Sequence, residues 1–90
     1  MAYADMRLEP PCVDLDRNAP AEELYKVGLA YAAGTGVAID LVAAHKWFNL
    51  AAAKGSEAGK AARQDMADQM SADEVARAQR AAREWFMKAN

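Results

Sequence analysis

Two copies of one pattern of small and aromatic residues limit the folds open to this chain. The first copy is Ala44, Trp47, Phe48 and Ala51, and 38 positions later (82 − 44) the second is Ala82, Trp85, Phe86 and Ala89. Spacings of three and four residues place each copy on one face of a helix. A helical unit with this period is typical of solenoids, in which each helix pair buries its apolar face against the next pair. The repeat predicts an all-α protein of two stacked helix hairpins.

The length of the chain fits one such unit. Its 90 residues are enough for one domain with one core, and much of the 53% hydrophobic fraction is alanine, which allows helices to approach closely. We expect an irregular N-terminal tail over residues 1–18, a first hairpin over 19–55, and a degenerate second hairpin or C-terminal cap over 56–90.

The tail has no helical period, and the adjacent Pro10 and Pro11 exclude a helix around them. Two interpretations stay open. The tail is a mobile leader, or it is a strap with three apolar side chains laid along a groove: Leu8, Val13 and Leu15.

Capping signals divide the first hairpin. Asn18 is the expected N-cap of a first helix, which carries Leu24, Val27 and Tyr31 on one face and ends at Gly34. A second helix is expected to begin after the cap Asp40 and to end at Gly55, with the first aromatic copy along it.

The second half predicts two more helices. One runs from Glu57 to about Gln69, with its apolar stripe on Ala58, Ala62, Met66 and Met70. Ser71 and Glu74 have the spacing of a capping box, which opens a fourth helix with the best-defined amphipathic pattern in the chain.

Most of the conspicuous residues have a packing or turn role. Gly28 and Ala44 are small, as a close helix crossing requires. Gly34 and Gly36 permit left-handed backbone angles in a short turn. The large buried surfaces come from three aromatic residues: Tyr31, Trp47 and Trp85.

These residues resemble a known family, the Sel1-like repeat, which is related to tetratricopeptide repeats. The stretch 21–58 matches it at Val27, Gly28, Tyr31, Gly34, Thr35, Gly36, Val37, Asp40, Ala44, Trp47, Ala51, Ala52 and Gly55. The segment 60–85 resembles, more loosely, the unit that often closes bacterial members, because the capping box replaces the glycine turn.

The resemblance implies a non-catalytic adaptor that binds another protein or a peptide. On this hypothesis the inner face uses side chains of the first helix in each unit: Glu23, Lys26, Ala30 and Gln64. Two alternatives stay open. Phe86 and Met87 form an apolar end that could bury itself against a second copy in a homodimer. The third hypothesis is an anionic-ligand or nucleic-acid binder that uses the arginines of the last helix, Arg77, Arg80 and Arg83.

Charge and cysteine content narrow the partners and the compartment. A net charge of −2 argues against broad binding of nucleic acid or of an anionic membrane. Cys12 is the single cysteine, so no disulfide forms within the chain. With no apolar run typical of a signal peptide or a membrane span, we expect a cytoplasmic protein.

No residue set predicts catalysis, a metal or a cofactor. His45 is the single histidine, and we expect it at the rim or exposed. The turn at Gly34 and Gly36 follows a helix and leads to an acidic cap, which does not suit phosphate. The nearby carboxylates are expected in capping or solvated positions: Asp65, Asp68, Asp73 and Glu74.

Overall fold

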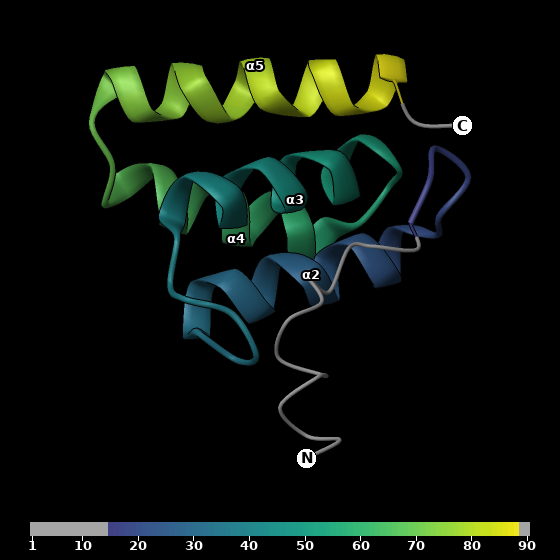
Figure 1. Ribbon diagram of the computed structural model, residues 1–90, viewed down its shortest axis with the longest axis horizontal. Helices are drawn as coiled ribbons and strands as arrows, with labels where there is room; N and C mark the ends of the chain where they lie inside the picture. Colours follow the sequence, from purple (N-terminus) through teal and green to yellow (C-terminus); the bar gives the residue numbers. More distant parts are fainter. Residues whose placement is uncertain (1–14, 89–90) are drawn as a thin grey trace.

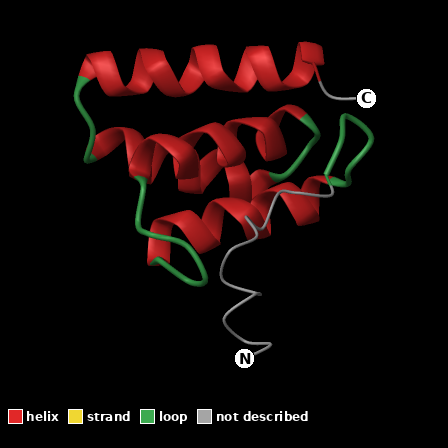
Figure 2. Cartoon of the chain, in the orientation of Figure 1, coloured by secondary structure: helices red, strands yellow, loops and turns green. Residues whose placement is uncertain are grey.

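The structure is a computed structural model that describes residues 15–88. Four helices make up most of this range: α2 (Ala21–Ala33), α3 (Leu41–Ala53), α4 (Glu57–Asp68) and α5 (Ala72–Lys88). No strand occurs among the described residues (Figures 1 and 2). The prediction of an all-α fold of stacked helices is confirmed.

The central helix is α3, because the most extensive helix contacts are those of α3 with α2, α4 and α5. In Figure 1, α5 runs along one side of α3 and α2 along the other. The two helices of the second half are consecutive in sequence, yet each packs mainly against α3. Six residues of α3 are therefore buried: Ala44, His45, Trp47, Phe48, Leu50 and Ala51.

The ends of α2 and α3 follow the predicted caps. Gly34 takes a left-handed φ of 76°, and its N–H donates to the carbonyl of Ala30 at 2.8 Å. The Asp40 side chain accepts a hydrogen bond from the N–H of Ala43 at 3.0 Å. The Asp40 N–H also donates to the carbonyl of Tyr31, so the loop folds back onto α2.

Local side-chain bonds also define the second half. Ser71 and Glu74 form the predicted capping box: the Ser71 N–H donates to the Glu74 carboxylate at 2.9 Å, and the Glu74 N–H donates to the Ser71 hydroxyl at 3.1 Å. The cap of α4 is Ser56, whose hydroxyl accepts from the N–H of Gly59 at 2.8 Å. That second cap was not predicted.

The start of α2 differs from the prediction. Pro20 occupies the N-cap position, and its carbonyl accepts the first helical hydrogen bonds from Glu23 and Leu24. The predicted cap Asn18 lies two residues earlier, in a turn where its N–H donates to the Asp16 side chain. The prediction was wrong because Asn18 belongs to the turn closed by Asp16, and the chain enters the helix two residues later at Pro20, whose φ of −68° suits a helix start without a side-chain cap.

The predicted apolar stripe of α4 differs from the structure at one position. Its other three members are half-buried: Ala62, Met66 and Met70. Ala58 is exposed, whereas Gly59 is buried. A Cβ on Gly59 would lie 2.9 Å from the Cβ of Ala51 and 3.1 Å from the carbonyl oxygen of Phe48. The helix turns its glycine toward α3, because this position lets the two backbones approach most closely.

The two tryptophans meet at the contact between α3 and α5. Their ring centroids are 5.1 Å apart with an interplanar angle of 73°, the edge-to-face geometry that aromatic pairs favour. On the other side of α3, Phe48 packs against Tyr25 of α2 with ring centroids 5.6 Å apart. The aromatic residues of α3 therefore pack against both α2 and α5.

Gly28 of α2 lies against the Phe48 ring of α3, with no room for a side chain. A Cβ added there would lie 2.5 Å from two carbon atoms of the Phe48 ring. The predicted need for a small residue at this crossing is confirmed, and the ring of Phe48 is its reason.

The described end of the tail lies against the helices. Leu15 packs against the core cluster, and Ala19 is buried in it. The Lys54 ammonium, just after α3, donates to the carbonyl oxygen of Arg17. Residues 15–18 are non-helical, as expected for the tail, and the contact of Leu15 fits the strap interpretation. Leu8 and Val13 lie outside the described residues.

Candidate interaction surface

The predicted partner-binding residues lie on three helices. On α2, the Lys26 ammonium lies 3.5 Å from the Glu23 carboxylate, and both side chains are largely exposed. Ala30, one turn further along α2, is half-buried. On α4, the Gln64 amide donates to the Asp68 carboxylate at 3.1 Å. The fold brings Glu23 and Lys26 together in one ion pair and places Gln64 on another helix.

The predicted basic edge lies on α5, where Arg77, Arg80 and Arg83 are all exposed. Their spacing of three residues turns the row gradually around the helix, because an α-helix has 3.6 residues per turn. The Arg83 side chain therefore lies on a different side of α5 from the Arg77 side chain. It lines an apolar trough, and Arg77 does not.

This trough lies between α3 and the second half of α5 and has a volume of about 340 Å³. Its apolar lining comes from Leu50, Ala53, Ala82, Phe86 and Met87. Phe86 is 46% exposed and Met87 is 77% exposed, among the most exposed large apolar side chains in residues 15–88. An apolar surface formed by two helices is more informative than a single exposed residue, because it offers a continuous area for another molecule.

Polar groups border the trough. Arg83 and Asn49 complete its lining, which includes no carboxylate from residues 15–88. The Asn49 side-chain oxygen accepts a hydrogen bond from the Arg63 guanidinium of α4 at 2.7 Å. Neither Arg63 nor Arg83 forms an ion pair with another described residue. The lining therefore holds one positive charge, that of Arg83, and Arg63 of α4 reaches its edge only through the hydrogen bond to Asn49.

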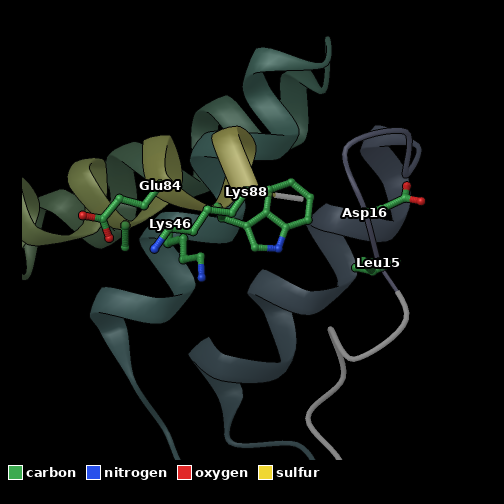
Figure 3. A pocket seen from close by; sticks show the side chains of 7 residues that line it. Leu15, Asp16, Lys46, Glu84 and Lys88 are labelled. Atoms are coloured by element: carbon green, nitrogen blue, oxygen red, sulfur yellow. The ribbon is translucent and has the colours of Figure 1, made fainter. Parts of the chain in front are cut away.

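A second hollow lies on another flank of α5, beside Trp85 (Figure 3). Its volume is about 540 Å³, and its lining has charges of both signs: Asp16 and Glu84, with Lys46 and Lys88. The Lys46 ammonium lies 4.6 Å from the centroid of the Trp47 ring, a cation–π contact. Opposite charges within one wide hollow do not select for one class of ligand.

His45 is buried, with an exposed fraction of 2%. The expectation of an exposed or rim histidine is therefore wrong: α4 packs over this part of α3, a contact that the sequence pattern of α3 did not predict. The imidazole Nδ1 has no hydrogen-bond partner in the part of the chain that the structure describes. Burial lowers the pKa of His45 below its usual 6.5, and the positive charge of Arg63 lowers that pKa further. The imidazole is neutral near pH 7.

The carboxylates near the last turn cap a helix or are exposed to solvent, as expected. Glu74 is part of the capping box and Asp68 accepts from Gln64. Within residues 15–88, no three His, Cys, Asp or Glu side chains are grouped so that they could hold a metal ion. None of the helices in that range has the length and apolar character needed to cross a membrane.

Comparison with known proteins returned no match: neither a protein-family model, nor a curated protein, nor a solved structure is similar to this chain at a significant level.

Sequence reasoning identified part of the trough and missed the rest. Phe86 and Met87 stand out as an apolar helix end in the sequence. The opposite wall on α3 and the border held by Asn49 and Arg63 depend on which helices pack together. One hint of this border was present in the sequence, the polar Asn49 next to the aromatic residues of α3. That hint did not show that α4 would pack beside it.

Proposed function

We propose that this chain is a non-catalytic protein-interaction module of the Sel1-like repeat type, an adaptor that binds another protein. The observation that carries the proposal is the open apolar edge at the end of the helix stack. In stacked helical repeats, each helix pair covers the apolar face of the pair before it. Phe86 and Met87, near the end of the last described helix, are exposed, so no described helix covers them.

The composition of the helices supports the same function. The aromatic and alanine residues of α3 are used for packing, and the glycines serve turns and close helix crossings. The residues that match the Sel1-like pattern in 21–58 have these packing and capping roles, among them Gly28, Gly34 and Asp40. A surface held in place by such packing is preorganised, which lowers the entropic cost of binding another protein.

Photocrosslinking in the native cell tests this proposal. A benzophenone amino acid at Phe86 of the full chain should form an adduct with a distinct protein, identified by mass spectrometry. The matched control carries the same amino acid at Lys60, an exposed residue of α4 that does not line the trough. We expect the adduct at Phe86, its loss when Met87→Glu is added, and its absence at Lys60.

Other outcomes would contradict the proposal. No adduct at Phe86, or the same set of adducts at both positions, would show that this edge holds no specific partner. Adducts of the chain with itself would instead support the self-association alternative, for which the exposure of Phe86 and Met87 is also the favouring observation. Sedimentation of the purified chain over a range of concentrations would measure that association directly.

A further inference from the structure

We propose that the trough between α3 and α5 binds an amphipathic helix of a partner protein, with carboxylate side chains on both sides of the helix's apolar stripe. This inference rests on the proposed adaptor function and specifies the chemistry of the partner. Helix-in-groove binding is a common mode of recognition, in which side chains three and four residues apart enter an apolar groove.

The dimensions of the trough suit a short helical segment. Along α5 its lining extends from Ala82 to Met87. At a rise of about 1.5 Å per residue, this length accommodates about one and a half turns of a docked helix. Met87 and Phe86 form the exposed part of the wall, and the flexible methionine can adapt to side chains of different shape.

The positive charge beside the trough determines which charged side chains a docked helix can carry next to its apolar stripe. Arg83 lines the trough on the α5 side. Asn49 lines it on the α3 side and accepts a hydrogen bond from the Arg63 guanidinium of α4, which lies next to the lining and not in it. Carboxylates on both flanks of an apolar stripe would face these two arginines. Lysines at the same positions would be repelled by both. This complementarity gives the trough a preference for an acidic helix.

The same charges argue against a second copy as the occupant. In a two-fold dimer the same surface is used by both copies, so troughs packed face to face would bring two copies of Arg83 into one interface whose described lining has no carboxylate to pair with them. The apolar lining, with one charged member, likewise suits a helix better than a phosphate backbone.

Binding of two synthetic peptides to the full chain tests the inference. The first is a helical peptide with leucines at alternating third and fourth positions and glutamates on both sides of that stripe. The second replaces every glutamate with lysine. By fluorescence anisotropy at low salt, we expect the glutamate peptide to bind at least about tenfold more tightly, since a few ion pairs together supply that factor. Added salt should reduce the difference.

Three variants locate the binding site. Met87→Glu should weaken the glutamate peptide about tenfold or more, because it puts a carboxylate into the apolar wall. Arg83→Glu should remove the preference for glutamate over lysine or invert it. Arg77→Glu is the matched charge reversal on α5 outside the trough and should leave the preference unchanged. All three residues are exposed, so circular dichroism should show the parent's helix content in each variant.

Several results would overturn the inference: equal binding of the two peptides, no binding of either, or equal effects of Arg77→Glu and Arg83→Glu. A dimer that forms with rising concentration and is lost in Met87→Glu would assign the trough to a second copy. The two proposals fail separately. If Phe86 crosslinks to a cellular protein and the glutamate peptide does not bind, the adaptor function stands and the acidic-helix inference falls. If the peptide binds and no cellular adduct forms, the adaptor function is contradicted.

Discussion

The two aromatic copies have the same residues and different surroundings. In α3, Trp47 and Phe48 are 2% and 1% exposed, whereas in α5 Trp85 is half-buried and Phe86 is 46% exposed. α3 packs extensively against three helices, and α5 packs extensively against α3 alone. The comparison teaches that the same pattern is covered on two sides in α3, and that in α5 one side is left exposed.

The largest expected effect separates the two tryptophans. Trp47→Ala should lower the free energy of unfolding by about 3 to 5 kcal/mol, because it leaves a large cavity in the centre of the fold. From its sequence pattern Trp85 would be expected to behave in the same way. Since Trp85 is half-buried, we expect Trp85→Ala to cost clearly less. Urea unfolding followed by circular dichroism measures both.

The phenylalanines provide the control for this comparison. Phe48→Ala should also cost about 3 to 5 kcal/mol, whereas Phe86→Ala should change the free energy of unfolding by less than about 1 kcal/mol. Equal losses in the two variants would mean that α5 is covered on both sides in solution, and would remove the open edge on which the proposed function depends.

A smaller effect is expected at the crossing of α2 and α3. In Gly28→Ala the new methyl group meets the Phe48 ring, which should cost about 1 to 3 kcal/mol by overpacking. The gain in helix propensity, about 1 kcal/mol, offsets part of that loss. Adding Phe48→Leu should make the alanine less costly, and thermal unfolding of the double-mutant cycle measures this coupling. An alanine that stabilises the chain in the parent background would contradict the close contact.

The contact of the tail with the core should contribute less to the free energy of unfolding than the helix crossing at Gly28. Leu15→Ala should reduce the free energy of unfolding by about 1 kcal/mol, because Leu15 is only half-buried against the core cluster. Arg17→Ala is the matched control, since its side chain is exposed and its carbonyl makes the contact with Lys54. Denaturant unfolding that gives identical values for the parent and Leu15→Ala would favour the mobile-leader interpretation of the tail.

The buried histidine predicts a pH dependence of stability. Because the pKa of His45 is lowered in the folded chain, the unfolded chain binds more protons as the pH falls below the usual 6.5. The free energy of unfolding should therefore decrease as the pH falls through 6.5, until the folded chain also takes up the proton. His45→Gln should remove this component in thermal melts between about pH 7.5 and pH 5.5. A parent chain with constant stability over that range would place His45 in contact with solvent.

The aromatic copies, the capping box and the turn glycines could be recognised in the sequence because each depends on residues a few positions apart. Ser71 and Glu74 satisfy each other's backbone groups, and Gly34 permits the left-handed turn that ends α2. The candidate site could be predicted only in part. Phe86 and Met87 belong to one helix, whereas Leu50 and the Asn49–Arg63 border come from two others.

By itself, then, the sequence determined the helices, most of their ends and the residues of the aromatic faces, since hydrogen bonds within about four positions and helical spacing act locally. The tertiary structure decided which faces are covered. It buried His45, turned Gly59 rather than Ala58 toward α3, and left Phe86 exposed. The physical reason is that burial depends on side chains distant in sequence, and the direction from which each helix approaches α3 determines which residues those are.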